Sequence, residues 1–197
     1  MKKKKEAHPY VSRGGVKLEH ALKEFQVEVE GKVALDVGAS TGGFTDCLLK
    51  HGAAKVYTVD VGYGLLEWKL RKDPRVKVVE RTNVRYLTPE QLYGEAPKAD
   101  LATIDVSFIS LSNVLPSVYE LLTKEAEVVA LIKPQFEARR EQVERGGIVR
   151  DEKVRQEVIE KVKAAAEKLG FSVKGMTASP IKGADGNVEY LMYMGKR

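Results

Sequence analysis

The chain contains very little cysteine and no long apolar run, and each of these absences excludes a class of protein. Cys47 is the one cysteine among 197 residues, so no internal disulfide can form, and we expect a reducing, cytoplasmic location. No apolar run approaches the ~18 residues of a membrane-spanning helix, and the start, MKKKKEAHPY, lacks the apolar segment of a signal peptide. Clusters of Cys and His with zinc-binding spacing are also missing. We therefore expect neither a bound metal nor a membrane partner.

Positive charge is present but unevenly distributed. The formal net charge is +5, and residues 1–24 contain seven Lys and Arg against three Glu. Such a segment can contact nucleic acid, although a solvated tail is the alternative for Lys2–Lys5. The rest of the chain is nearly neutral, so an RNA-binding surface would have to be a local patch. Candidate phosphate-binding residues, each an ordinary surface residue on the alternative interpretation, are Arg13, Arg139, Arg140, Arg145 and Arg150.

Apolar strand patterns alternate with helical patterns along the chain. We expect strands at 32–38, 55–62, 76–80, 99–108, 127–136, 171–179 and 187–194, and helices at 14–25, 41–50, 65–73, 111–122 and 152–169. This alternation predicts an α/β fold with a doubly wound, mostly parallel seven-stranded sheet. The last two strands leave no room for a helix between them, so the last strand must be antiparallel. Residues 1–12 are expected to be a basic tail or linker, residues 13–197 one domain, and 137–150 a charged loop.

A glycine-rich turn follows the first strand in LDVGASTGGFTD. A strand, glycine turn and helix allow the backbone to approach a ligand closely, at the crevice where doubly wound sheets bind nucleotides. The dinucleotide fingerprint is imperfect because Ser40 replaces its second glycine, and a P-loop is excluded because Phe44 follows Gly43 instead of lysine. A nucleoside ligand without a triphosphate remains. The candidate cofactor-binding residues of this turn are Asp36, Gly38, Ser40, Thr41, Gly42, Gly43 and Phe44.

Two further polar residues follow the next two strands. Asp60 stands 22 residues after Gly38, where a carboxylate can accept both ribose hydroxyls. Asn83 follows the third strand and is a candidate for reading an adenine edge. Alone, each residue is better explained by turn or capping chemistry. Together, at successive strand ends, they favour a nucleoside site.

Several motifs occur in a fixed order along the chain. SRGGVKL comes first, VALDVGASTGGFTD, VYTVDVG, DVSFISL and LIKPQFEA follow, and GNVEYL comes near the end. In these motifs, from about Tyr10 to Met194, the chain resembles the TlyA (hemolysin A) family of ribosomal RNA 2′-O-methyltransferases, relatives of the FtsJ-type enzymes. The resemblance implies a Rossmann-like methyltransferase fold, S-adenosylmethionine (SAM) as cofactor, and ribosomal RNA or ribosomal subunits as partner.

The family usually has a small S4-type RNA-binding domain ahead of SRGG. Only about a dozen residues stand there in this chain, so we expect that domain to be absent and RNA binding by the chain to be weak. The hemolysin label implies lysis, for which the sequence offers no spanning or pore-forming segment.

The FtsJ-type enzymes carry a Lys-Asp-Lys-Glu tetrad, which the resemblance places at Lys17, Asp105, Lys133 and Glu189. A ribose hydroxyl is a poor nucleophile and must lose its proton as it attacks the methyl group, and a lysine can accept that proton when its amine is neutral. We expect Lys133 to be the base, Lys17 and Asp105 to position it and the substrate, and Glu189 to support them. Asp105 also counts among the cofactor-binding candidates. Without the family, Lys17 would be interpreted as solvated and Glu189 as facing outward.

Rival methyltransferase chemistries lack their residues here. Carbon-5 methylation of pyrimidines needs a cysteine nucleophile, and Cys47 stands in the helix after the glycine turn. Methylation of an exocyclic amine commonly uses an Asn/Asp-Pro-Pro-aromatic turn, where this chain has Asp105-Val-Ser-Phe108. Phe108 is expected either to wall the cofactor or to pack, and Trp68 to pack in the core. A non-catalytic assembly protein that binds SAM and RNA remains the alternative function, and a cytolysin is disfavoured.

Overall fold

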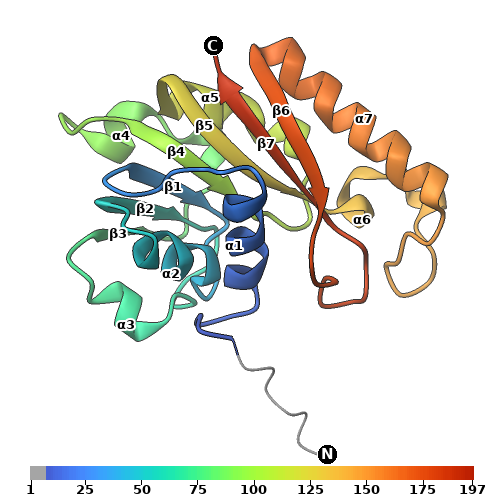
Figure 1. Ribbon diagram of the computed structural model, residues 1–197, viewed down its shortest axis with the longest axis horizontal. Coiled ribbons are helices and arrows are strands. Elements are labelled where there is room, and N and C mark those ends of the chain that lie inside the picture. The colour runs from blue at the N-terminus through green and yellow to red at the C-terminus, as the bar shows by residue number, and fades with distance from the viewer. Residues whose placement is uncertain (1–7) are drawn as a thin grey trace, which may run out of the picture.

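The computed structural model describes residues 8–197, which form one seven-stranded sheet covered by helices (Figure 1). The strands are β1 (Val33–Val37), β2 (Lys55–Val59), β3 (Val76–Val79), β4 (Ala99–Ile104), β5 (Leu122–Ile132), β6 (Phe171–Ala178) and β7 (Tyr190–Lys196). Their order is β3-β2-β1-β4-β5-β7-β6. Only β7 runs antiparallel to its neighbours β5 and β6. The predicted doubly wound sheet with an antiparallel last strand is confirmed. The lysine run of the predicted tail, Lys2–Lys5, lies outside the described residues.

Helices cover both faces of the sheet. They are α1 (Gly14–Glu24), α2 (Gly43–Lys50), α3 (Trp68–Arg71), α4 (Pro89–Tyr93), α5 (Leu115–Leu121), α6 (Pro134–Glu137) and α7 (Glu152–Leu169). Short 3₁₀ turns are η1 (Val84–Tyr86), η2 (Leu111–Asn113) and η3 (Arg140–Gln142). The first three helices pack in one apolar cluster and α4, α5 and α7 in another, so the sheet lies between two layers of core. Figure 1 shows α1 and α2 beside each other on one face.

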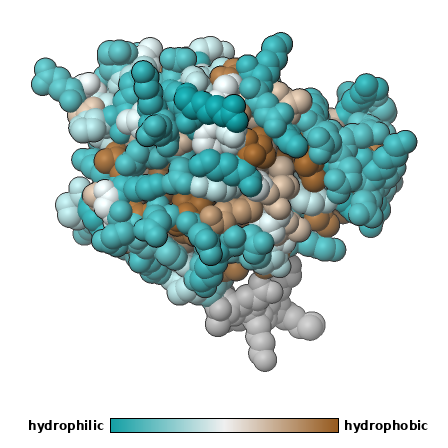
Figure 2. All heavy atoms as spheres, turned by 45° about the horizontal axis from the view of Figure 1, so that its top comes forward, coloured by the Kyte–Doolittle hydropathy of each residue, from teal (hydrophilic) through white to brown (hydrophobic). Residues whose placement is uncertain are grey.

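Strand β5, in the interior of the sheet, shows why both faces are buried. Val128 and Ala130 pack in the cluster under α5 and α7, whereas Val129 and Leu131 pack in the cluster under α1 and α2. Successive side chains of a strand point to opposite faces, so a strand between two layers has to be a continuous apolar run. Figure 2 shows the outer surface on the α7 side, at the right, covered by hydrophilic side chains.

Several predicted boundaries differ from those observed. The strand expected at 99–108 ends at Ile104, and the one expected at 127–136 covers Leu122–Ile132, because Pro134 begins α6. Residues 137–150 include the end of α6 and η3 and otherwise form the predicted loop. Helix α4 was not among the predicted elements, and it begins at a capping box formed by Thr88 and Gln91.

The helix expected at 65–73 is limited to the four residues of α3. The prediction that Trp68 packs in the core is wrong. Trp68 is 65% exposed, and Leu66 and Leu70 fill the core instead. The short helix turns Leu70 inward and leaves Trp68 outside, where the ammonium of Lys72 lies 4.8 Å from the centre of its ring. Within residues 8–197, no helix has the length and apolar character of a membrane span.

Candidate active site

The glycine turn after β1 brings the ends of β1 and β4 into close contact. Gly38 has φ +83°, and a Cβ there would lie 2.4 Å from the backbone oxygen of Asp105. Gly42 has φ +98°, and its Cβ would collide with the side chains of Leu70 and Leu66. Both positions need glycine, but for different reasons. Gly38 lets two strand ends meet, whereas Gly42 makes room for the core side chains beside α3.

Asp36 lies beneath this turn with its side chain fully buried. Its two carboxylate oxygens accept hydrogen bonds from the Thr45 hydroxyl at 2.6 Å and the Thr103 hydroxyl at 3.0 Å. Burial raises the pKa of Asp36 to about 7, the hydroxyl bonds oppose that rise, and the charge of Asp105 adds to it. The carboxyl group joins β1, β4 and α2. It lines neither cavity described below, so its side chain braces the turn rather than facing the expected cofactor.

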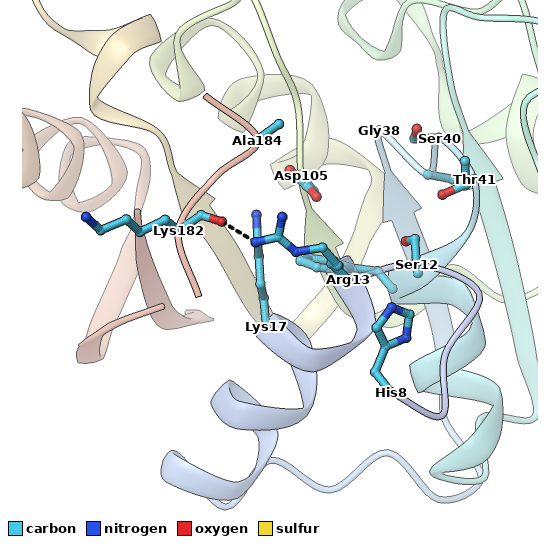
Figure 3. Close-up of a pocket in the computed structure, with 14 residues that line it drawn as sticks. His8, Ser12, Arg13, Lys17, Gly38, Ser40, Thr41, Asp105, Lys182 and Ala184 are labelled. Carbon is cyan, nitrogen blue, oxygen red and sulfur yellow. Dashed lines mark hydrogen bonds between the residues drawn. The ribbon is translucent and has the colours of Figure 1, made fainter. Parts of the chain in front are cut away.

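Two cavities open at the carboxyl edge of the sheet, and they share a wall made of Gly38, Ser40 and Asp105. The first encloses about 520 Å³, and the residues that line it include Asp60, Leu65, Asn83, Val106, Phe108 and Ile109. The second encloses about 800 Å³ and is lined by His8, Ser12, Arg13, Lys17, Thr41, Gly43, Phe44 and Lys182 among others (Figure 3). The junction of the two cavities therefore includes Asp105, the residue that follows β4.

The expected cofactor residues divide between these cavities. Asp60 and Asn83 line the first cavity, as expected of a nucleoside site. Thr41, Gly43 and Phe44 line only the second, and Gly42, like Asp36, lines neither. The carboxylate of Asp60 accepts hydrogen bonds from the backbone N–H groups of Ser40 at 2.8 Å and Gly62 at 2.7 Å. Asn83 caps η1 by accepting the backbone N–H of Arg85 at 3.1 Å. Turn chemistry is thus present at both residues, and each also faces the cavity.

The tetrad residues form two close ion pairs. The Lys133 ammonium lies 2.6 Å from Asp105 Oδ1 and donates to Ser107 Oγ at 2.8 Å. The Lys17 ammonium donates to Glu189 Oε2 at 2.5 Å, and both residues are buried, at 8% and 3% exposure. Asp105 and Lys133 directly follow β4 and β5, as expected.

Lys17 and Glu189 are neither solvated nor outward-facing. Glu189 stands just before β7 rather than inside the predicted strand. Figure 3 shows Lys17 rising from α1 toward Asp105.

Phe108 is the exposed aromatic residue at the mouth of the first cavity. It is 90% exposed and has φ +63°. Its ring centre lies 4.9 Å from that of Phe136. Phe108 therefore lines the cavity and contacts one aromatic neighbour instead of packing in the core.

Two buried polar residues beside the site were missed by the sequence analysis. Glu137 accepts the Ser110 hydroxyl and the Leu111 backbone N–H, each at 2.6 Å, and burial raises its pKa while these bonds oppose the rise. Asn187 donates to the Gly147 carbonyl and accepts from the Val149 backbone N–H. The partners of Glu137 stand 26 or 27 residues away, and those of Asn187 stand 38 or 40 residues away. Glu137 stands in the motif LIKPQFEA and Asn187 in GNVEYL, but contacts over such separations leave no local pattern that assigns either residue a role.

Comparisons with known proteins agree with this architecture. YqxC of Bacillus subtilis, whose name describes a candidate rRNA methyltransferase, is 54% identical over 94% of this chain and 65% of its own length. TlyA of Mycobacterium tuberculosis, named a 16S/23S rRNA (cytidine-2′-O)-methyltransferase, is 49% identical over 94% of this chain and 68% of its own length. The chain thus spans about two thirds of these curated relatives.

A crystal structure of a hemolysin-named protein from Lactococcus lactis is 56% identical and superposes with a TM-score of 0.93. The match covers 97% of this chain and 90% of that one. The FtsJ-like methyltransferase family matches residues 10–196. The resemblance seen in the sequence motifs is confirmed, and the chain belongs to the FtsJ-like methyltransferase family.

Proposed function

We propose that this chain is a SAM-dependent methyltransferase that modifies the 2′ hydroxyl of a ribose in ribosomal RNA. The observation that carries the proposal is the Asp105–Lys133 ion pair, because Asp105 forms part of the wall between a cavity suited to a nucleoside and a cavity lined by cationic residues. A group that removes a proton from a substrate must stand where substrate and cofactor meet. Asp105 marks that place and holds the ammonium of Lys133 beside it.

The first cavity has the features that a nucleoside cofactor needs. Gly38 presents backbone without a side chain, and Asp60 offers a carboxylate for ribose hydroxyls. The apolar side chains of Leu65, Val106 and Ile109 offer walls for a flat base. SAM, when bound, supplies a methyl group that a nucleophile can attack. Thr41, Gly43 and Phe44 stay candidates for its amino-acid end, because the adjacent Ser40 lines both cavities.

The second cavity has the charge expected of an RNA site. Arg13 and Lys17 bring positive charge to it, the backbone carbonyl of Lys182 accepts from Arg13, and His8 and Ser12 add polar groups. Cationic side chains position a nucleic acid through its phosphates. The name of the Mycobacterium tuberculosis relative supports ribosomal RNA as the substrate.

In the proposed reaction Lys133, as the neutral amine, accepts the proton of the ribose hydroxyl. Asp105 and Ser107 fix the position of its nitrogen. Lys17, held by Glu189, orients the hydroxyl from the side of α1. The alternative of a non-catalytic SAM-binding protein is disfavoured, because the chain keeps all four residues and folds them into two tight pairs.

The proposal is tested by incubating the protein with methyl-labelled SAM and, separately, ribosomal RNA, small subunits, large subunits and ribosomes. Mass spectrometry of the digested RNA should find the label on a ribose 2′ oxygen of one of these substrates. Label on a base would contradict the proposed chemistry. SAM binding without transfer to any of the four substrates would favour the non-catalytic alternative.

A further inference from the structure

Asn187 is a buried amide beside the site that the proposed reaction does not use. It is 1% exposed and lies between β6 and β7. Its Nδ2 donates to the Gly147 carbonyl at 2.8 Å, and its Oδ1 accepts the Val149 backbone N–H at 2.9 Å. A buried amide with both ends satisfied by backbone holds two chain segments in a fixed relation. Here the second segment is the arginine segment, residues 139–150.

On one side, Asn187 belongs to the loop that presents the tetrad glutamate. Its backbone carbonyl accepts the N–H of Gly183 at 2.9 Å, and the Ser179 N–H donates to the Glu189 carbonyl at 2.8 Å. A Cβ at Gly183 would lie 2.4 Å from Glu189 Oε1, so this loop wraps tightly around the carboxylate. A displacement of Asn187 would therefore displace Glu189 and its ion pair with Lys17.

On the other side, the arginine segment carries exposed positive charge on irregular backbone. Its arginines are Arg139, Arg140, Arg145 and Arg150, all exposed. Its regular structure is limited to η3 and an isolated bridge between Glu144 and Ile148. From α7, Arg155 donates to the carbonyls of Val149 at 3.3 Å and Arg150 at 2.7 Å. The backbone around Val149 is thus held by α7 from one side and by Asn187 from the side of the site.

We propose that Asn187 is a positioning residue that couples RNA binding on the arginine segment to the geometry of the Lys17–Glu189 pair. The inference rests on the proposed function, because it assigns RNA phosphates to the exposed arginines. The two hydrogen bonds of the Asn187 amide hold the arginine segment, and the phosphates bound to it, in a fixed position relative to Glu189. Without the amide, the segment still attracts phosphate but no longer fixes the target ribose against the ion pair.

The first test uses Asn187→Ala in single-turnover methyl transfer at saturating RNA and SAM. The rate should fall at least about tenfold, whereas SAM affinity should stay within about twofold. Ser179→Ala is the matched control, because its hydroxyl donates to Ile181 within the same loop and does not contact the arginine segment. Its rate should stay within about twofold of the parent. Asn187→Asp is the second variant. It keeps the acceptor for the Val149 N–H but places an oxygen against the Gly147 carbonyl, so its rate should fall as well, and a parent rate in both variants would overturn the proposal.

A double-mutant cycle separates coupling from general destabilisation. Arg140→Gln with Arg145→Gln should lower the single-turnover rate at saturating RNA in the parent. In the Asn187→Ala background the same two changes should have little further effect on that rate, because the coupling is already lost. If the rate loss from the two arginine changes is the same in the parent and in the Asn187→Ala background, the proposal is overturned, whether or not Asn187→Ala is itself slower.

Hydrogen exchange provides a readout that does not depend on methyl transfer. Loss of the amide should raise exchange at residues 144–149 and 183–189 together, whereas Ser179→Ala should raise it only within 179–189. If the parent binds SAM but methylates no RNA, the proposed function fails and exchange still decides whether the amide joins the two segments. Exchange that rises only within 183–189 would overturn the inference.

Discussion

At the residue scale, Asp36 carries a carboxyl group that is buried without a cation and held by two hydroxyls. Because burial raises its pKa from near 3.8 to about 7 in the folded protein, the folded state binds the proton more tightly than the unfolded state. The stability that this proton contributes is present below about pH 4 and is lost as the pH rises through about 7. Asp36 thus makes the turn between β1 and α2 sensitive to pH.

Asp36→Asn should remove this sensitivity. The unfolding free energy of the variant relative to the parent should rise between pH 4 and pH 7, with a slope of at most about 1.4 kcal/mol per pH unit. Denaturant unfolding of both proteins at pH 5, 6, 7 and 8 measures the difference. A difference that stays constant over this range would mean that Asp36 is charged throughout.

Gly42 and Gly64 separate backbone strain from packing. Both have positive φ, but a Cβ at Gly64 meets nothing within 4 Å, whereas one at Gly42 lies 2.3 Å from Leu70 Cδ1. Gly64→Ala should lower the unfolding free energy by about 1–2 kcal/mol, which is the cost of placing a residue with a Cβ in the left-handed conformation. Gly42→Ala should cost about 1–3 kcal/mol more, because the core side chains of Leu66 and Leu70 must move. Equal losses of unfolding free energy for the two variants would show that the Leu66–Leu70 contact is not tight.

At the element scale, Glu137 joins α6 to the segment that follows Asp105. Its buried carboxyl group accepts from Ser110 and from the backbone of Leu111, where η2 begins. Glu137→Gln places an amide donor against one of these donors, and we expect a loss of about 1–3 kcal/mol in unfolding free energy. Glu141→Gln, at an exposed position of η3, is the control and should change stability by less than about 0.5 kcal/mol. A loss of similar size in both variants would refute the assigned role of Glu137.

The elements also show what the sequence could reveal. Asp105 and Lys133 could be placed because each ends an apolar strand, and parallel strands of a doubly wound sheet end at one edge. The burial of Lys17 and Glu189 could not be inferred from local pattern, because their ion pair joins residues 172 positions apart. The family tetrad named both residues, but only the packing of α1 against the loop before β7 puts them together.

Short elements were the least predictable. Trp68 fitted the apolar face of a longer helix, but α3 has only four residues and turns Leu70 inward instead. The glycine turn was located correctly, yet Gly42 and Asp36 serve packing and bracing there. Periodicity identifies which segments are helical, whereas contacts with other segments decide where each side chain points.

At the scale of the whole molecule, the positive charge available to RNA is spread over several elements. Arg13 is the N-cap residue of α1, Lys182 lies between β6 and β7, and the arginine segment lies between α6 and α7. We expect weak RNA binding whose affinity falls steeply with salt, because scattered phosphate contacts release counterions. Titrations at 50, 100 and 200 mM salt measure the slope, and deleting residues 1–9 should weaken binding further. Tight binding insensitive to salt would contradict this expectation.

The central claim is that Lys133, paired with Asp105 beside the junction of the two cavities, takes the proton of the ribose hydroxyl. Single-turnover transfer from labelled SAM to the competent ribosomal substrate tests it most directly, with SAM affinity measured in parallel. Lys133→Ala should lose at least about a hundredfold in rate while SAM affinity stays within a few fold. Lys23→Ala, which removes an exposed lysine paired with Glu19 on α1, should leave both unchanged. A Lys133→Ala protein that transfers methyl groups at the parent rate would contradict the account.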